Sequence, residues 1–354
     1  MSRELRNALE LQDQLLPGVS RTFALTIPQL PDGLREPITN AYLLCRIADT
    51  IEDDLSLTRA QKAAYHRQFI ELVNGTEPVG EFGSELAPLL SQQTPADEIE
   101  LITQTAGVIT VTHSFNDRQR GALERCIAIM CNGMPQYQED KSIAGLPTVA
   151  DMDKYCYYVA GVVGEMLTEL FCDYSSTIAT HRSSMMPLAI AFGQGLQMTN
   201  ILKDFWEDRA AAACWLPQEL FHNHGLNLAD ADSPAFQNRF EKGIEELLGM
   251  AHAYLRDALG YVHLIPSNEI GIRRFCLWAI GLAVHTLQSI RRHPEYRTGA
   301  AVKISRGAVR RILLISNLCS RSNRLLRFGF KMLARGLPLK SELMQSQRAW
   351  AGSR

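Results

Sequence analysis

The sequence lacks the motifs that mark the common nucleotide-binding folds. It contains neither GxGxxG nor GxxxxGK[ST], which argues against a Rossmann or a P-loop domain. Few stretches alternate between apolar and polar residues, and no Asn-Gly or Asp-Gly pair joins two such stretches. A series of β-strands is therefore not expected, and the expected class is all-α.

Paired cysteines and long apolar runs are missing as well. No CxxC pair occurs among the eight cysteines, and most of them lie in apolar helical stretches, which predicts reduced thiols and argues against a zinc site. No uninterrupted apolar run approaches the roughly 20 residues that span a bilayer. The polar residues 1–7 do not resemble a signal peptide, so we expect a cytoplasmic protein.

What is present is a hydrophobic chain with an uneven distribution of charge. Its 354 residues are 46% hydrophobic, which suits a large core, and its net charge is −2. Residues 291–354 nevertheless carry fifteen Lys or Arg and two Asp or Glu, so an acidic body precedes a basic end. Such an end predicts an anionic partner, which is a membrane surface, a phosphate-bearing ligand or, least favoured, a nucleic acid.

Apolar residues recur with helical spacing along most of the chain, and turn residues separate the resulting segments. The pattern predicts ten helices, at about 1–16, 35–54, 58–74, 84–92, 97–114, 117–138, 155–171, 185–209, 234–263 and 268–291.

An acidic stripe ends the second of these helices. Asp49, Glu52 and Asp53 have the spacing that places side chains on one helical face. Two residues extend the stripe toward the helix start, Arg46 and Tyr42. Clustered carboxylates repel one another, and a divalent cation that takes oxygen ligands would hold them together. Taken alone, a solvated acidic helix end is the preferred interpretation.

A second polar stripe on the helix over 185–209 changes that balance. Its members, at helical spacing, are Gln197, Asn200, Asp204 and Asp208. Two such stripes in an all-helical chain are less readily explained by chance than one. Facing each other across a bundle core, they could hold several Mg²⁺ ions that bridge carboxylates to phosphate oxygens, which implies a diphosphate ligand.

The helix over 155–171 has two glycines in its interior, Gly161 and Gly164. Each costs about 1 kcal/mol of helix propensity relative to alanine, so either close helix packing or the approach of a ligand is expected there. Tyr155 borders this region. Near the N-terminus, Ser20-Arg-Thr-Phe23 follows a Pro-Gly turn and can begin a helix, where Arg21 is either a surface arginine or an anion ligand.

These motifs together resemble the squalene/phytoene synthase family, trans-isoprenyl diphosphate synthases that join two chains head to head. The resemblance covers about residues 18–310. Two motifs are most similar to those of the squalene synthases in that family, namely Tyr155-Cys-Tyr-Tyr-Val-Ala-Gly161 and Leu196-Gln-Met-Thr-Asn200. The resemblance implies an all-α, single-domain isoprenoid-synthase-type bundle over residues 1–300 with a central active-site cavity, and a basic helical segment over 301–354.

The resemblance also implies a reaction. Two farnesyl diphosphates condense to presqualene diphosphate with Mg²⁺, and NADPH then reduces this intermediate to squalene. Implied metal ligands are Asp49, Glu52, Asp53, Asn200, Asp204 and Asp208; implied substrate contacts are Arg21, Thr22, Phe23, Tyr42, Arg46, Val159, Gly161 and Gln197. Tyr155 would assist the proton loss that closes the cyclopropane, and Asn200, Lys303 and Arg306 would contact the cofactor.

The sequence departs from the family where NADPH matters. Squalene synthases carry Val-Lys-Ile-Arg-Lys-Gly, whereas this chain has Val302-Lys-Ile-Ser-Arg-Gly307. Squalene synthases also carry a Tyr-Asn-Asn motif upstream, where this chain has His285-Thr-Leu-Gln288. The retained Val302-Lys-Ile304 favours a reductive enzyme, and a presqualene diphosphate, dehydrosqualene or phytoene synthase without the reductive step is the alternative.

The basic end of the chain has two interpretations. Its cations alternate with leucines, isoleucines and phenylalanines, as in Arg321, Arg324, Arg327 and Lys331. It is either an amphipathic membrane-surface helix, which we favour, or a packing helix with a solvated face. Eukaryotic members of the family end in a membrane-spanning helix, which is not expected here. A non-catalytic helical membrane-surface protein is the alternative of another class, and a monomer is the preferred expectation.

Overall fold

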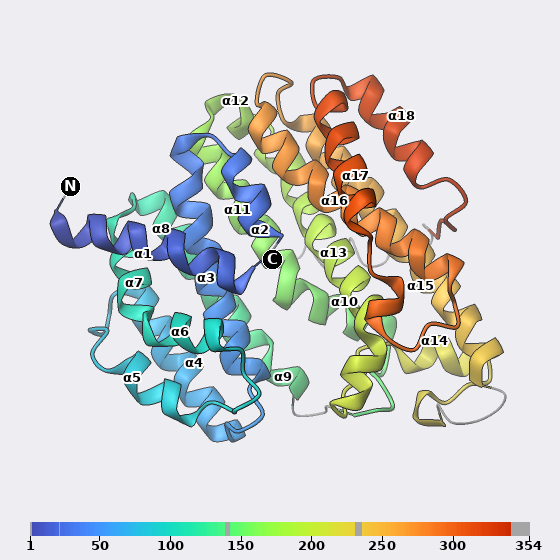
Figure 1. Ribbon diagram of the computed structural model, residues 1–354, viewed down its shortest axis with the longest axis horizontal. Coiled ribbons are helices and arrows are strands. Elements are labelled where there is room, and N and C mark those ends of the chain that lie inside the picture. The colour runs from blue at the N-terminus through green and yellow to red at the C-terminus, as the bar shows by residue number, and fades with distance from the viewer. Residues whose placement is uncertain (1, 21, 139–141, 231–235, 341–354) are drawn as a thin grey trace. The chain divides into compact units, whose positions relative to one another are not determined.

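The computed structural model of the protein describes residues 2–20, 22–138, 142–230 and 236–340 (Figure 1). Within these ranges the chain forms helices and no strand, apart from one isolated bridge between Leu146 and Pro217. The all-α prediction is therefore confirmed.

The chain divides into two compact units, which are described separately. One comprises Met1–Gln138 and Glu165–Thr180, and the other comprises Glu139–Gly164 and His181–Arg354. The prediction of a single domain over residues 1–300 stays a prediction.

The first unit is built around α3 (Asp32–Asp53), whose buried face includes Leu44, Ile47 and Ile51. α3 packs against several other helices of this unit. They are α1 (Arg3–Val19), α4 (Arg59–Asn74), α6 (Ala96–Thr103), α7 (Thr105–Ser114) and α8 (Asp117–Gly133). This packing buries most of the helix that carries the first acidic stripe.

The second unit is built around the long helix α13 (Arg182–Ala210), which carries the second stripe. Its main neighbours are α15 (Phe236–Leu264), α16 (Ile270–Arg292) and the π-helical turn η3 (Tyr157–Gly161) that follows α10 (Val149–Cys156). The remaining helices of the two units are α2 (Phe23–Thr26), α5 (Phe82–Leu86), α9 (Pro135–Gln138), α11 (Val162–Tyr174), α12 (Ser176–Ala179), α14 (Gln218–Asn223), α17 (Arg306–Cys319) and α18 (Asn323–Leu333).

The expected helices over 84–92 and 117–138 are each divided in two, the first into α5 and a 3₁₀ turn at Ala87–Leu89 and the second into α8 and α9. Three further helices differ in detail. The helix over 97–114 is broken at Gln104, where the backbone leaves helical values and α6 gives way to α7. The first helix does not stop before Pro17, because the amide of Ser20 closes the last turn on the carbonyl of Leu16 at 3.0 Å. A proline in that turn removes only one internal hydrogen bond. The third difference is the π turn, which interrupts the helix over 155–171.

α16 is the one helix in the described ranges that is long and apolar enough to cross a membrane by length and composition. Its most apolar window is 67% buried inside the protein, as is also expected of a core helix. Its polar residues agree with burial, since Gln288 donates to the carbonyls of Leu333 and Arg335 and thereby holds the end of α18.

Candidate active site

The first acidic stripe lies at the C-terminal end of α3, where negative charge is unfavourable beside the helix dipole. Asp53 is exposed, Asp49 is half-buried and Glu52 is buried. Burial raises the pKa of Asp49 to about 7; Arg46 opposes this rise, and the neighbouring carboxylates Asp53, Glu98 and Glu52 add to it. A carboxyl group that repels its neighbours in this way is suited to receive a cation.

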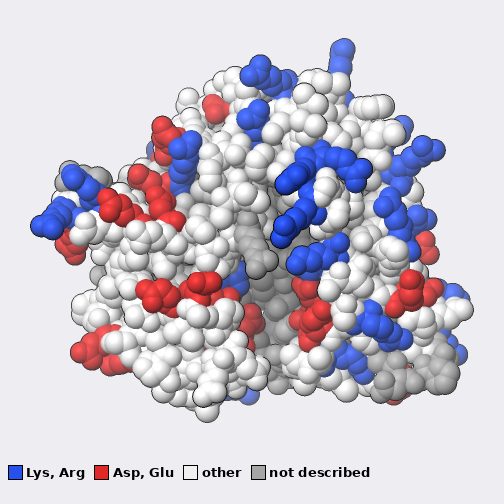
Figure 2. All heavy atoms as spheres, in the orientation of Figure 1, with Lys and Arg blue, Asp and Glu red and all other residues white. Residues whose placement is uncertain are grey.

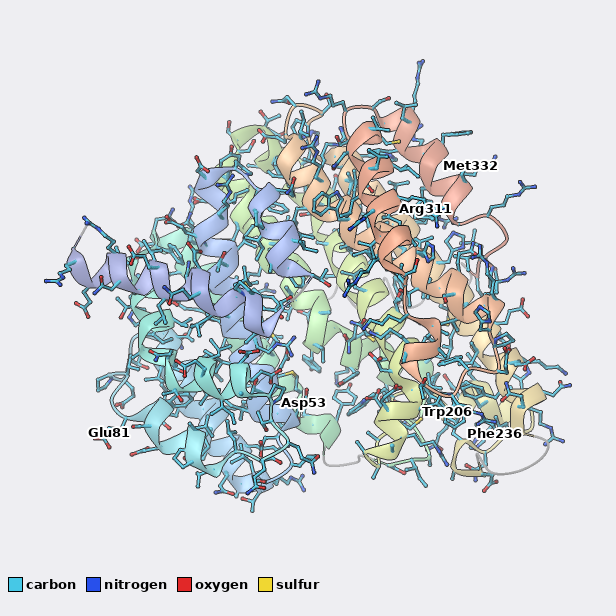
Figure 3. All side chains as sticks on the ribbon, in the orientation of Figure 1. Asp53, Glu81, Trp206, Phe236, Arg311 and Met332 are labelled. Atoms are coloured by element: carbon cyan, nitrogen blue, oxygen red, sulfur yellow. The ribbon has the colours of Figure 1, made fainter. Side chains whose placement is uncertain are left out.

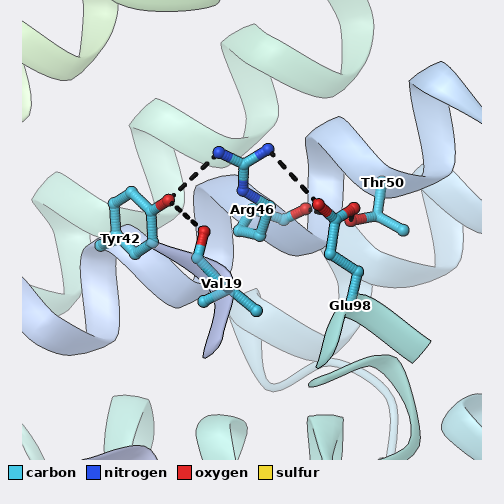
Figure 4. Close-up of polar contacts among 5 residues, drawn as sticks. All are labelled: Val19, Tyr42, Arg46, Thr50 and Glu98. Carbon is cyan, nitrogen blue, oxygen red and sulfur yellow. Dashed lines mark hydrogen bonds and ion pairs between the residues drawn. The ribbon is translucent and has the colours of Figure 1, made fainter. Parts of the chain in front are cut away.

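Arg46 is held in place beside this cluster by a hydrogen-bonded chain (Figure 4). The hydroxyl of Tyr42 donates to the Val19 carbonyl at 3.0 Å, and Arg46 Nη2 donates to the Tyr42 hydroxyl at 3.1 Å. Arg46 Nη1 lies 3.9 Å from Glu98 Oε1, and the Thr50 hydroxyl donates to Glu98 Oε2 at 2.9 Å. Arg46 Nε is buried and makes no hydrogen bond among the described residues. The arginine is thus oriented in advance of any ligand.

Glu98 is a member of this cluster that the sequence did not indicate. It lies in the first turn of α6, where an acidic residue is usual because of the helix dipole. No spacing rule links it to Asp49, since the contact depends on how α6 packs against α3.

Glu52 faces the core of the unit. Its Oε2 lies 3.7 Å from Nδ1 of the buried His66, and the Lys62 ammonium donates to the Glu52 backbone carbonyl. His66 Nε2 is 3.3 Å from the Ala48 carbonyl, and burial lowers the pKa of His66 to about 4, so the imidazole is neutral. Glu52 therefore differs from Asp53 in exposure, although the two share the predicted stripe.

Asp54 has a structural role. Its carboxylate accepts hydrogen bonds from the amides of Ser56, Leu57 and Ser91 and from the Thr94 hydroxyl, at 2.7–3.0 Å. Burial alone would raise the pKa of Asp54, but these donors hold it below its ordinary value. The carboxylate ties two loops to the end of α3 and is turned away from the stripe.

The predicted substrate contacts near the N-terminus are only partly described. Arg21 lies outside the described residues. Thr22 is exposed, and the amide of Phe23 donates to the Ser20 hydroxyl at 3.0 Å, which begins α2 as expected. The rings of Phe23 and Tyr42 are 4.8 Å apart, so this short helix is joined to the residue that orients Arg46.

The second stripe occupies one part of α13. Asn200 is exposed, whereas Gln197, Asp204 and Asp208 are half-buried. Asp204 Oδ2 lies 3.0 Å from the ammonium of Lys203. The neighbouring Trp206, labelled in Figure 3, is covered by another cation, since the guanidinium of Arg297 lies 4.2 Å from its ring centroid.

A distant segment is fixed against this stripe, which the sequence did not indicate. The amide of Gly299 donates to Glu207 Oε1 at 2.7 Å, and the Tyr296 hydroxyl donates to the Leu202 carbonyl. A Cβ added at Gly299 would lie 2.9 Å from Asp204 Oδ1. That Cβ would also lie 3.2 Å from the Lys203 carbonyl oxygen, so glycine lets this backbone pack closely against α13 without a shift of the Asp204 side chain.

The same segment leads directly to the residues predicted to contact a cofactor. The 3₁₀ turn η5 (Gly299–Val302) contacts α13, and the exposed Lys303 follows it. Arg306, also exposed, begins α17. Between them, Ser305 accepts a hydrogen bond from the Ala308 amide at 3.2 Å and caps α17. The serine that replaces the family's arginine thus begins a helix.

Tyr155 precedes the π turn and stacks on Trp215, with ring centroids 4.3 Å apart and planes inclined by 5°. Val159 and Gly161 lie within the turn. π turns inside helices are frequent at functional sites.

The glycines around this turn serve close helix packing. A Cβ on Gly164 would lie 2.1 Å from the Ala189 carbonyl oxygen, and one on Gly193 would lie 2.1 Å from that of Ala160. Of the two expectations for Gly164, packing against α13 is therefore the one observed. At Gly161 the nearest atoms also belong to the protein, in Tyr157 and Ile190.

A buried polar cluster supports the same helix. The Tyr254 hydroxyl donates to Asp153 Oδ1, and Gln194 Nε2 donates to the Asp153 carbonyl at 3.2 Å. Burial raises the pKa of Asp153 to about 6, although these hydrogen bonds oppose the rise. The cluster joins α10 to α13 and α15, two residues before Tyr155.

Protein ligands alone do not complete a metal site. Across the residues that the structure describes, no three His, Cys, Asp or Glu side chains are close enough together to hold a metal ion. Mg²⁺ in phosphate-binding sites is commonly held by one or two carboxylates together with substrate oxygens. The exposed Asp53 and the half-buried Asp49, Asp204 and Asp208 suit that kind of binding.

The chain is similar in sequence to proteins of one family. The family described as squalene/phytoene synthase matches residues 16–308. A squalene synthase of Botryococcus braunii is 31% identical over 310 residues, which are 86% of this chain and 64% of that protein. This chain thus spans less than two thirds of the length of that relative.

Solved structures confirm the fold. A complex of TcSQS with the ligand BPH1237 matches with a TM-score of 0.75 and 23% identity, over 93% of this chain and 91% of that one. A dehydrosqualene synthase in complex with a ligand has a TM-score of 0.65 and 20% identity, over 89% and 96%. The predicted isoprenoid-synthase-type fold is therefore confirmed.

Proposed function

The chain belongs to the squalene/phytoene synthase family, and on that premise we propose that it makes squalene. In this proposal two farnesyl diphosphates are joined head to head into presqualene diphosphate, which NADPH then reduces to squalene. The observation that carries the proposal is the pairing of an oriented arginine, Arg46, with an acidic stripe in which burial and crowding raise the pKa of Asp49 to about 7. Such a pair suits a diphosphate together with its cation.

We assign the metal ions to two sets of oxygen ligands. One set is Asp49, Glu52 and Asp53, and the other is Asn200, Asp204 and Asp208. Carboxylate oxygens are the ligands that Mg²⁺ prefers, and the raised pKa of Asp49 fits a position where a cation relieves repulsion. Bound Mg²⁺ would neutralise the diphosphate and make it a better leaving group.

Other side chains, which do not bind the metal ions, have the remaining roles in the proposal. Arg46, held by Tyr42 and Glu98, donates to diphosphate oxygens in the proposal, and Arg21 assists it. The apolar residues before the first stripe, such as Leu43 and Leu44, exclude water that would quench the allylic cation. Tyr155, fixed by its stack on Trp215, assists removal of the proton whose loss closes the cyclopropane. That proton passes to the departing diphosphate.

The reductive step is assigned to Lys303, Arg306 and Asn200, with NADPH as the hydride donor. η5 is fixed beside Asp204, and the exposed cation Lys303 follows it, which suits a phosphate-bearing cofactor. Ser305 stands where the family has an arginine, and this supports a second candidate function, a synthase without the reductive step. Without reduction, two farnesyl diphosphates would give presqualene diphosphate or dehydrosqualene, and two geranylgeranyl diphosphates would give phytoene.

A product assay separates these candidates. The purified protein is incubated with farnesyl diphosphate and Mg²⁺, with and without NADPH, and the lipid products are identified by mass spectrometry. We expect squalene only when NADPH is present. Presqualene diphosphate or dehydrosqualene in both reactions would contradict the reductive proposal, and a preference for geranylgeranyl diphosphate would indicate a phytoene synthase.

Asp49→Ala and Asp204→Ala test the acidic stripes within the same assay. Each should lower product formation by at least about a hundredfold, because each removes a proposed metal ligand. Glu81→Ala is the matched control, since Glu81 is an exposed acid outside the stripe (Figure 3). If all three variants retain activity, the metal assignment is wrong.

We further propose that the protein is a monomer and that it works in the cytoplasm, bound peripherally to the inner face of the membrane.

A further inference from the structure

The helical hairpin of α17 and α18 exposes large apolar side chains. Each of six such residues has between 50% and 69% of its surface accessible, although single exposed residues of this kind are ordinary elsewhere. They are Leu314, Ile315, Leu318, Leu325, Phe328 and Met332. Six on two consecutive helices form a surface that a protein in water alone has no reason to keep.

On α18 the exposed apolar residues occupy one face. Leu325, Phe328 and Met332 follow the i, i+3, i+7 spacing of a single helical stripe, and Met332 projects outward in Figure 3. Leu326, on a different side of the helix, is buried. One apolar side of α18 therefore packs against the rest of the protein, and a second apolar side is free to contact a partner.

Cations accompany this apolar stripe. Arg324, Arg327 and Lys331 are exposed on α18, and helical spacing places them beside the stripe, away from the buried Leu326. Arg335, just after the helix, is exposed as well. The stretch from Arg306 to Lys340 contains nine Lys or Arg and no Asp or Glu. In Figure 2, Lys and Arg side chains gather over α17 and α18. The surface is apolar and positively charged at once.

The hairpin is firmly attached to the body of its unit. Trp278 Nε1 donates to Asn317 Oδ1 at 3.1 Å, and the buried Arg273 donates to Asn323 at the start of α18. Gln288 holds the far end of α18, as described above. The exposed face is thus presented by a rigid support and needs no refolding to bind.

We propose that this face, the α17–α18 surface, docks the protein on an anionic lipid bilayer. Phe328, Met332 and their apolar neighbours enter the boundary between headgroups and acyl chains, while the cations contact lipid phosphates. Charge complementarity selects this partner over a second copy, because two such faces would bring like charges together. The rest of the chain, with 27 Lys or Arg against 38 Asp or Glu, has no such attraction to an anionic bilayer. The inference rests on the peripheral membrane location proposed above, to which it assigns a surface, and it does not depend on the proposed reaction.

Sedimentation with vesicles tests the α17–α18 surface. The full chain is mixed with vesicles of phosphatidylcholine containing 30% phosphatidylglycerol, or of phosphatidylcholine alone, and the bound fraction is measured. We expect binding to the anionic vesicles and its loss as salt is raised. Phe328→Ser with Met332→Ser should weaken binding by about tenfold or more, and Arg324→Gln with Arg327→Gln and Lys331→Gln by roughly a hundredfold at low salt.

Matched variants lie outside this surface. Leu55→Ser removes an exposed apolar residue, and Arg67→Gln with Arg118→Gln removes exposed charges, from the other unit. These should bind as the unchanged protein does. The proposal would be overturned if these control variants lost as much vesicle binding as the surface variants. It would also be overturned if neither set of substitutions in the α17–α18 surface changed vesicle binding. A concentration-dependent dimer in analytical ultracentrifugation that the Phe328 and Met332 substitutions abolish would overturn it too, since the face would then belong to a second copy. Circular dichroism verifies that every variant is folded.

Discussion

At the scale of single residues, Asp153 is a carboxyl group whose protonation is tied to folding. It is buried with Tyr254 and Gln194, and its pKa is raised to about 6 from an ordinary value of 3.8. Between these two values the folded protein holds a proton that the unfolded chain has released. This contribution to stability is complete below pH 3.8 and is lost as the pH rises through 6.

We therefore expect Asp153→Asn to gain stability relative to the unchanged protein as the pH rises. The gain between pH 4 and pH 7 should approach about 3 kcal/mol, because each pKa unit corresponds to about 1.4 kcal/mol. Denaturation midpoints of both proteins across this range provide the measurement. Tyr254→Phe, which keeps the carboxyl group, serves as the control and should retain the pH dependence. A constant difference between Asp153→Asn and the unchanged protein would contradict the assignment.

Residue spacing predicted the acidic stripes, but not the surroundings of each member. The sequence places Asp49, Glu52 and Asp53 on one face, and the structure buries Glu52 against His66 while Asp53 stays exposed. The difference arises from the packing of α4 against α3, which no periodicity within α3 can specify. Glu98 was missed for the same reason.

At the scale of elements, the backbones of η3 and α11 pack directly on α13. Gly164→Ala would place a methyl group 2.1 Å from the Ala189 carbonyl oxygen, and backbone cannot move aside as a flexible side chain can. We expect a loss of about 1–3 kcal/mol or more in stability, measured by chemical denaturation. Gly121→Ala is the control, because nothing lies within 4 Å of its added Cβ in α8. That substitution should stabilise the protein by up to about 1 kcal/mol, and equal losses from both would contradict this account.

Ser305 supports a second prediction at this scale. Ser305→Ala removes the cap of α17 and should cost about 1 kcal/mol, whereas Ser305→Thr should keep most of the stability. Hydrogen exchange at the amides of Ala308 and Val309 would detect the difference locally. Ser305→Arg restores the family's residue. If the proposed cofactor site is right, it should lower the KM for NADPH even as it weakens the cap.

Helix existence was predictable from apolar periodicity, and helix irregularity was not. The stretch 155–171 has a helical, apolar sequence that continues through the π turn at Tyr157–Gly161, so it was predicted as one regular helix. The break at Gln104 was likewise missed, because no proline or glycine marks it. The π turn packs against α13, a contact that periodicity within one helix does not reveal.

At the scale of the whole molecule, the proposed site predicts linked binding of a cation and an anion. Inorganic diphosphate with Mg²⁺ should raise the melting temperature, and either one alone should have little effect. A ligand present at a hundredfold its Kd stabilises by about 2.7 kcal/mol. Asp49→Asn and Asp204→Asn should each reduce the shift, while Glu81→Gln should leave it unchanged. If the two aspartate variants respond as the unchanged protein does, a non-catalytic helical protein becomes the better interpretation.

The sequence predicted the all-α class because it lacks strand patterns and nucleotide-binding motifs. The resemblance of a few motifs to a known family predicted which all-α fold it is. What the motifs could not show is the attachment of Tyr296 and Gly299 to α13, through contacts between residues 94 and 92 positions apart. Such contacts depend on tertiary packing, which the spacing of residues within one helix does not specify.

The π turn at Tyr157–Gly161 has a consequence for insertions and deletions. Each residue advances an α-helix by about 100°, and a π turn accommodates one residue more than a regular turn. Deleting a single residue there would convert the π turn into a regular α turn and leave Tyr155 and Gly164 in nearly their present relative orientation. Inserting a further residue would instead rotate Tyr155 relative to Gly164 by about 100°, and either the stack on Trp215 or the packing of Gly164 on α13 would be lost. This stretch should therefore tolerate a shorter length better than a longer one.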